Sequence, residues 1–279
     1  MKQTKILPVL AVVLCLPGVV VRALHMLNGF DIGTGLPAAG DAWVWYFAAL
    51  LVAAAVVYAV LSIPLRAANN LPFEQLLGTQ SVGFRMAAVI SGLLLLVGGV
   101  GYLYLTMTTG EEDAAGWAKA LEIVYAAVTV LCGVCAIGLA KAQSSEMTEQ
   151  SAKLTLVPLL WSCLHLLVNY RMTCVDPKLA SFAFGLVADV ILVLAFYNLA
   201  CLLYGKPHPA WLAFFSAVTT TMAVSDMGGY GLSRLMGVTT PEWSEKMVLR
   251  GCLSVAACIL LAAELFVLCR DHSTADISE

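Results

Sequence analysis

The sequence predicts an all-α membrane protein, a single bundle of eight transmembrane helices. Of the 279 residues, 61% are hydrophobic and 12% are charged, whereas a soluble domain averages about 45–50% apolar and about 25% charged residues. Eight apolar runs approach the roughly 20 residues that a helix needs to cross a bilayer. The connections between these runs are too short for a soluble domain. The expected partner is therefore a lipid bilayer, and a net charge of −3 argues against nucleic acid.

The eight runs are expected to be helices, because lipid offers no hydrogen-bond partner to the backbone groups of an open strand. In chain order they cover residues about 6–27, 42–64, 83–107, 117–140, 154–171, 180–204, 209–228 and 248–269. The fifth run is short and the seventh is rich in Thr and Ser, so these are the weakest spans. Arg22 and Arg171 each end the first helix of a set of four, which raises the hypothesis of a 4+4 repeat with parallel halves.

The basic residues predict the orientation, because Lys and Arg favour cytoplasmic loops. With the N-terminus in the cytoplasm, six of those up to residue 153 lie inside and two lie outside. The six are Lys2, Lys5, Arg66, Arg85, Lys141 and Lys153, and the two are Arg22 and Lys119. The acidic segment 110–116 (GEEDAAG) then lies outside. We therefore expect a multi-pass plasma-membrane protein with both termini in the cytoplasm.

Polar side chains inside the apolar runs are the candidate functional residues, because ionisable groups at membrane depth usually face a bundle interior or a watery cavity. Eight of them share the predicted outer half of the bilayer: Arg22, His25, Glu122, His165, Asn169, Asp189, Asp226 and Arg250. Asp189 lies about nine residues into its helix, which is about 13 Å at 1.5 Å per residue. A carboxylate at that depth cannot easily reach water.

This concentration of polar residues has two interpretations. In the first, the side chains line a pocket open to the outside, with Asp189 at its floor and Arg22 or Arg250 facing a substrate anion or a carboxylate. In the second, the charges pair with one another, and those near helix ends reach the lipid headgroups. An unpartnered Asp189 would be neutral and suited to proton coupling, whereas a partner such as His165 or Arg22 would keep it charged.

The connection at residues 28–41 (NGFDIGTGLPAAGD) is the most distinctive loop. Its glycines, proline and aspartates are typical of tight turns with bonds from side chains to the backbone. Its motif, which follows Arg22, consists of Phe30, Asp31, Thr34 and Gly35. This pattern resembles one found in uncharacterised multi-spanning proteins of anaerobic Gram-positive gut bacteria. The resemblance implies a bacterial plasma-membrane protein with a distinctive outer loop, and it brings no catalytic residues.

No motif indicates an enzymatic reaction. The Cys-x-x-Cys at 132–135 lies among small residues in an apolar run, which favours helix packing over disulfide exchange. The sequence lacks the zinc-protease, serine-nucleophile and aspartyl-protease motifs, so no catalytic residue, metal ligand or cofactor is assigned.

Two functional hypotheses follow. The first is a small-solute transporter, or the membrane subunit of one, that binds a small polar solute or a proton near Asp189. The second is a membrane sensor or regulatory protein without transport activity, whose partner-binding surface would be the loops at 65–82 and 141–153. Both hypotheses allow a homo-oligomer or a complex with another membrane protein.

Overall fold

The structure is a computed structural model that describes residues 5–31, 33–109, 116–143, 153–174, 179–204, 206–237 and 241–270. Within these ranges the fold is all-α. The long helices are α1 (Ile6–Asn28), α2 (Trp43–Ser62), α4 (Val82–Thr108), α5 (Gly116–Ala142), α7 (Leu156–Thr173), α8 (Leu179–Leu203), α9 (Pro209–Leu235) and α10 (Glu245–Leu268). A 3-10 helix, η1 (Ile63–Ala68), and the short α3 (Phe73–Leu77) join α2 to α4.

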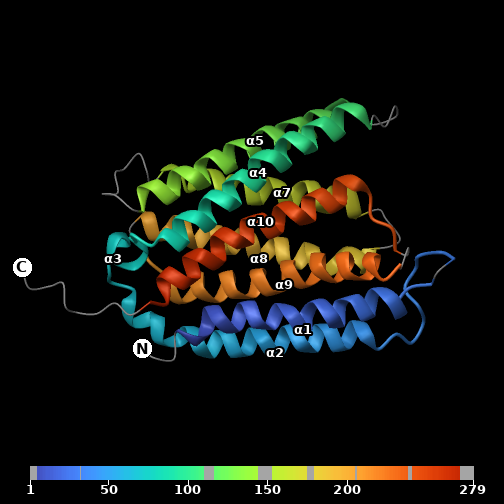
Figure 1. The fold of residues 1–279 in the computed structure, drawn as a ribbon, viewed down its shortest axis with the longest axis horizontal. Coiled ribbons are helices and arrows are strands. Elements are labelled where there is room, and N and C mark those ends of the chain that lie inside the picture. The colour runs from blue at the N-terminus through green and yellow to red at the C-terminus, as the bar shows by residue number, and fades with distance from the viewer. Residues whose placement is uncertain are drawn as a thin grey trace, which may run out of the picture.

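The long helices run side by side along the long axis of the molecule (Figure 1). The start of α1, the end of α10 and the short α3 lie at one end, which we call the terminal end. The connection between α1 and α2 lies at the opposite end, which we call the loop end. Each predicted apolar run corresponds to one long helix, and the bounds agree within a few residues except that α9 continues to Leu235.

Six of these helices are long and apolar enough to cross a bilayer: α1, α2 together with η1, α4, α5, α8 and α10. The chain is therefore a polytopic membrane protein. Its outward faces carry exposed apolar side chains such as Leu16, Val52 and Val97, which are 70%, 63% and 71% exposed. Lipid must cover such a surface, because large apolar patches are unfavourable in water.

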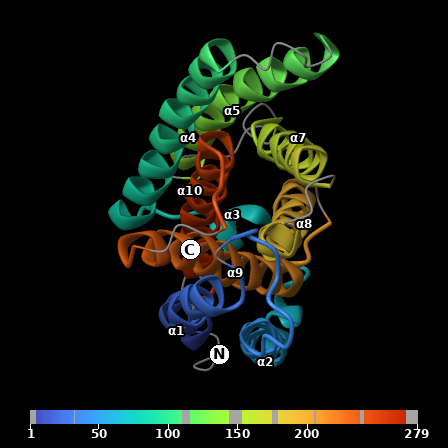
Figure 2. The same ribbon diagram turned by 90° about the vertical axis from the view of Figure 1, so that its right-hand side faces the viewer.

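The helices α7 and α9 fall outside this set of six, and they are the two runs whose sequences were weakest as spans. α9 lies inside the bundle, where it packs against α1, α2, α8 and α10 (Figure 2). Its polar side chains, among them Ser216, Thr219 and Ser225, are buried. These hydroxyls therefore contact protein rather than lipid, which explains why a helix with so many of them is stable in this position.

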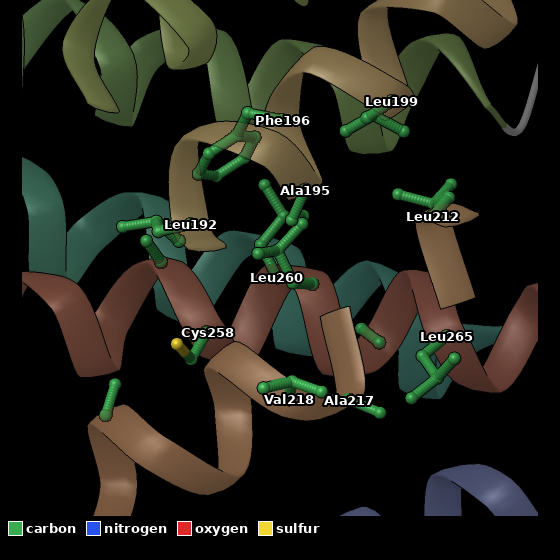
Figure 3. Packing of buried hydrophobic residues seen from close by; sticks show 14 of the residues in the cluster. Leu192, Ala195, Phe196, Leu199, Leu212, Ala217, Val218, Cys258, Leu260 and Leu265 are labelled. Atoms are coloured by element: carbon green, nitrogen blue, oxygen red, sulfur yellow. The ribbon is translucent and has the colours of Figure 1, made fainter. Parts of the chain in front are cut away.

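The terminal-end halves of α8, α9 and α10 form an apolar core (Figure 3). Leu192 and Phe196 of α8, Val218 of α9 and Leu260 of α10 belong to one cluster of buried side chains. Small residues such as Ala217 let the helices approach each other closely. The loop-end halves of the same three helices have a different composition, and the candidate site lies there.

Two glycines show how closely the helices approach. A Cβ atom at Gly133 of α5 would lie 2.6 Å from the carbonyl oxygen of Gly92 in α4. A Cβ atom at Gly229 of α9 would lie 2.5 Å from Cγ of Arg22 in α1. Because these positions have no space for a larger residue, α1 lies directly against α9, and Arg22 is held against the part of α9 that carries Asp226.

Candidate functional site

Asp189 of α8 is the centre of a buried hydrogen-bond network that joins three helices. Its Oδ2 atom accepts a 2.6 Å hydrogen bond from Nδ2 of Asn169 in α7, and its Oδ1 atom accepts a 3.0 Å bond from Oγ of Ser254 in α10. Nε2 of His165 lies 3.3 Å from the same Oδ1 atom. Of the two partners proposed from the sequence, Asp189 therefore contacts His165 and not Arg22.

His165 extends this network away from Asp189. Its Nδ1 atom lies 2.7 Å from the hydroxyl of Tyr125, and its Nε2 atom lies 2.7 Å from Oγ of Ser254. If Ser254 donates to Asp189 and the imidazole is neutral, Nε2 donates to Ser254 and Nδ1 accepts from the hydroxyl of Tyr125. The four side chains then form a continuous chain of donors and acceptors, of the kind that can pass a proton to or from Asp189.

Arg250 of α10 joins the same network from the opposite side of Asn169. Its Nε atom donates to Oδ1 of Asn169, and its Nη1 atom donates a 3.1 Å bond to the hydroxyl of Tyr102. Arg250 is only 1% exposed, yet its Nη2 atom has no hydrogen-bond partner among the described residues. A buried guanidinium with an open N–H group is unusual, because leaving a charged donor unpaired is energetically costly.

Arg22 forms a second buried cluster with Asp226. Its Nε atom donates a 2.8 Å bond to Oδ1 of Asp226, and its Nη2 atom donates a 2.6 Å bond to the carbonyl oxygen of Ser181. The Nη1 atom lies 2.5 Å from Nδ1 of His25, whose Nε2 atom lies 3.5 Å from Oδ2 of Asp41. All three guanidinium nitrogens of Arg22 are therefore occupied, in contrast to those of Arg250.

A cavity of about 60 Å³ separates the two clusters, between α7, α8, α9 and α10. Its polar lining includes Asn169, Asp189, Asp226, Arg250 and Ser254, and its apolar lining includes Phe182, Met227, Trp243 and Met247. One water molecule needs about 10–15 Å³ of such space, so the cavity has room for about four to six water-sized groups. Four of the eight polar residues predicted from the sequence thus line one cavity.

The other four predicted residues do not line this cavity. Three of them lie one layer further from the cavity. Arg22 bonds to the lining residue Asp226 and also contacts His25, and His165 lies beside the lining residue Asp189. Glu122 of α5 lies apart, where Oε2 accepts a 2.7 Å bond from Nζ of Lys246 and a 3.2 Å bond from Oγ1 of Thr106. Glu122 therefore forms an ion pair with Lys246.

An aromatic cluster covers the cavity at the loop end, and we call it the aromatic cap. It consists of Phe30, Phe182, Tyr230 and Trp243, packed with Met26. Trp243 stacks on Tyr230 with ring centroids 4.1 Å apart and lies 5.9 Å from the ring of Phe182. Because Phe182 and Trp243 also line the cavity, the cap links it to the loop that carries Phe30.

The loop motif explains how Phe30 is held in the cap. Oδ1 of Asp31 accepts a 2.8 Å bond from the backbone N–H of Gly33, and Oδ2 accepts a 3.3 Å bond from Oγ1 of Thr34. Gly35 has a φ of 69°, a left-handed conformation that glycine adopts without strain. The predicted tight turn therefore forms at this position, and it directs Phe30 into the protein.

Several residues of the site were not predicted from the sequence. Ser254 carried a usable signal, because it lies four residues after Arg250 and so on the same helix face. Tyr102 and Tyr125 carried no such signal, since tyrosine is common in membrane helices. Trp243 lies just before the last apolar run, where tryptophan is common as an interfacial anchor, but it is buried in the cap.

Comparisons with known proteins point to no activity: no protein-family model, curated protein or solved structure matches the chain. Within the described ranges, no group of three or more His, Cys, Asp or Glu side chains could hold a metal ion. The described lining of the cavity supplies carboxylate, guanidinium, amide and hydroxyl groups.

Proposed function

We propose that the chain is a small-solute transporter, or the membrane subunit of one, whose binding site is the cavity beside Asp189. The observation that carries this proposal is the cavity of about 60 Å³ whose lining brings together Asn169, Asp189, Asp226 and Arg250. Ionisable groups at membrane depth that line such a cavity are typical of ligand or proton sites.

The depth of the cavity supports the same proposal. Asp189 lies ten residues after the start of α8 at Leu179, which is about 15 Å along the helix axis. The hydrocarbon core of a bilayer is about 30 Å thick, so the floor of the cavity lies near its middle. A site at mid-membrane is typical of carriers, which expose one binding site to each side in turn.

The aromatic cap lies at the loop end of the cavity, and the apolar core of α8, α9 and α10 lies on its terminal side. Transport would require the cap to open in one state and the apolar core to separate in another. The loop at 28–41 is the natural moving part, because it inserts Phe30 into the cap from outside the helix bundle.

The membrane arrangement in this proposal has eight spans, because α9 inside the bundle and α7 at its edge would cross the bilayer together with the six apolar spans. We place the loop end outside the cell and the terminal end in the cytoplasm of a bacterial cell, in line with the basic residues near the terminal end. The 4+4 repeat stays a prediction, and so does the relation to the gut-bacterial proteins that share the loop motif.

A sensor or regulatory role remains the second hypothesis. One of the two loops suggested as its partner surface folds back onto the bundle, since Leu76 and Leu77 of α3 are fully buried and Gly78 bonds to Arg270. Most of the other loop, at 144–152, lies outside the described residues. The described part of the chain thus offers less support for a partner surface than for a ligand site.

The proposal can be tested with proteoliposomes that contain the purified chain. We expect uptake of at least one solute from an isotope-labelled panel of amino acids, carboxylates, amines, urea and inorganic ions. Asp189→Asn should reduce this uptake about tenfold or more, because it alters a group that lines the cavity. Uptake equal to that of empty liposomes for every solute would contradict transport.

Hydroxyl-radical footprinting separates the transport hypothesis from the alternatives. Met227 and Met247 line the cavity, whereas Met222 is buried in the apolar core. A cavity that exchanges water with the outside should give oxidation of the first two methionines and protection of Met222. A hydrated cavity without uptake would favour the sensor hypothesis, and equal protection of all three would contradict any ligand site.

A further inference from the structure

Glu264 of α10 is a buried carboxyl group that the proposed ligand site does not use. Its side chain is fully buried, and its Oε1 atom accepts a 2.5 Å hydrogen bond from Nε2 of Gln143, the residue that follows α5. The two other oxygens of this pair, Oε2 of Glu264 and Oε1 of Gln143, are buried without a partner among the described residues. The pair therefore leaves two buried oxygens unsatisfied.

No cation compensates a negative charge on Glu264 in the described part of the chain, where this residue forms no ion pair. The first turns of α9, which packs along α10, contain no charged side chain. The described charged side chains and the histidine of the other elements at the terminal end are all exposed. They are Lys5 before α1, Arg66 of η1, Glu74 of α3, Arg85 of α4, Lys141 of α5, Lys153 before α7, Lys206 and His208 before α9, and Arg270 after α10.

A proton on Glu264 satisfies both oxygens of the pair. A carboxylate can only accept hydrogen bonds, whereas a protonated carboxyl group also donates one. With the proton on Oε2, the amide N–H group donates to Glu264 and the carboxyl O–H group can donate to Oε1 of Gln143. The neutral form is favoured for a second reason, because an uncompensated carboxylate is costly in a poorly solvated site.

The pair lies at the junction that covers the terminal end of the bundle. The backbone oxygen of Gln143 accepts a 2.9 Å bond from the N–H of Thr79. Nη2 of Arg270 donates a 2.5 Å bond to the carbonyl oxygen of Gly78. The pair thus joins the end of α5 and α10 to the segment 73–79, which contains α3 and lies at the terminal end (Figure 1). We call the pair and this segment the terminal clasp.

We propose that Glu264 is a proton-binding site that is occupied at neutral pH, and that its proton keeps the terminal clasp closed. When the proton leaves to water at the terminal end, Glu264 carries a negative charge that the amide of Gln143 alone does not stabilise. The carboxylate then favours a conformation in which water reaches it, and the end of α5 and the segment 73–79 move away from α10. Glu264 lies four residues before the end of α10 at Leu268, about 6 Å along the axis, so the path for water is short.

Infrared spectroscopy of the purified chain in nanodiscs tests for the proton. An ordinary glutamate is ionised at about pH 7, so the carbonyl band of protonated carboxyl groups reports only groups that retain a proton. We expect such a band, and Glu264→Gln should remove the intensity of about one carboxyl group per chain. Glu74→Gln is the matched control, because Glu74 is an exposed carboxylate at the same end, and it should leave the band unchanged. An unchanged band in Glu264→Gln would overturn the proposal.

Isotope labelling of the glutamate carboxyl carbons decides the same question in the natural chain. The label shifts the band of a protonated glutamate and leaves that of a protonated aspartate in place, so it separates Glu264 from Asp189 and Asp226. Of the other described glutamates, Glu122 is paired with Lys246 and the rest are exposed. If Glu264→Gln does not fold, a band that does not shift on labelling would still overturn the proposal.

Hydrogen exchange of the segment 73–79 tests whether the proton closes the clasp. The exchange rate of the Thr79 N–H in the natural chain is divided by its rate in Glu264→Gln at the same pH, which cancels the intrinsic pH dependence of exchange. Opening releases a proton from the natural chain, so it is favoured as the pH rises, whereas glutamine has no proton to lose. The ratio should be constant in mild acid and then rise by up to about tenfold per pH unit, the slope for the release of one proton. A ratio that does not depend on pH would overturn the role of the proton in the clasp. No solute is present in these measurements, so they do not depend on the proposed ligand site.

Discussion

The two halves of α8, α9 and α10 differ in the side chains that fill the space between the helices. In the terminal-end half, Leu192, Val218 and Leu260 fill the space between the helices with apolar side chains (Figure 3). In the loop-end half, the same helices contribute Asp189, Asp226 and other charged groups around a cavity. The terminal-end half contains a buried carboxylate as well, Glu264, which accepts a 2.5 Å bond from Nε2 of Gln143. The difference is that, among the described residues, only the loop-end half gathers several charged groups around a cavity.

Hydrogen bonds hold most of the charged side chains of the polar half in place around the cavity. Breaking a buried ion pair leaves a charge in a low dielectric, which destabilises a protein much more than the pair stabilised it. The guanidinium of Arg22 is held at all three nitrogens, so it acts as a fixed support for Asp226. Arg250 is held at two nitrogens, and its third, Nη2, is buried without a partner among the described residues.

The largest expected effect is that of Arg22→Ala. This change leaves the carboxylate of Asp226 buried without its cation, and we expect the free energy of unfolding to fall by about 3–5 kcal/mol. Unfolding by SDS in mixed micelles measures it. Arg171→Ala is the control, because Arg171 is partly exposed and stacks on Trp117 with 4.3 Å between its Cζ atom and the ring centroid, and it should cost about 1 kcal/mol. Equal losses would refute the assigned support role of Arg22.

An intermediate effect is expected for Leu260→Ala in the apolar half. Leu260 is 1% exposed, and its truncation should lower the free energy of unfolding by about 2 kcal/mol, near the lower limit of the range for buried leucine. The loss is small for a leucine because lipid, unlike water, also solvates the exposed side chain. The footprinting of Met247, which lines the cavity, should not change. A change in that footprinting without a loss of stability would show that the two halves are not separate.

A smaller effect is expected where α9 meets α1. Gly229→Ala puts a methyl group 2.5 Å from Cγ of Arg22, and the displacement of Arg22 should destabilise the protein by about 1–2 kcal/mol through overpacking. Gly231→Ala is the matched control, because no atom lies within 4 Å of its Cβ position. The same SDS unfolding assay should show no loss for this variant, or a slight gain from the higher helix propensity of alanine. Equal effects of the two variants would mean that α1 and α9 are not in close contact.

The sequence was most informative where the lipid environment limits which backbone structures and side chains are tolerated. The apolar runs identified the helices, since backbone groups in lipid have to be paired internally, and Asp189 was recognised as unusual because a carboxylate is costly at that depth. The turn at Asp31 and Gly35 also followed from residue type. The different surroundings of Arg22 and Arg250 did not follow from residue type, because in the sequence both are simply arginines in the predicted outer half of the membrane.

Sequence alone determined the class of this protein, the position of its helices and the set of polar residues that could form a site. Only the tertiary structure decided which of them meet. Asp189 pairs with His165, Asn169 and Ser254, Arg22 pairs with Asp226, and Glu122 is separated from both by its bond to Lys246. The physical reason is that hydrophobicity and periodicity depend on neighbours along one chain segment. Charge pairing depends on which helix faces which, and this is set by close contacts such as that of Gly229 with Arg22.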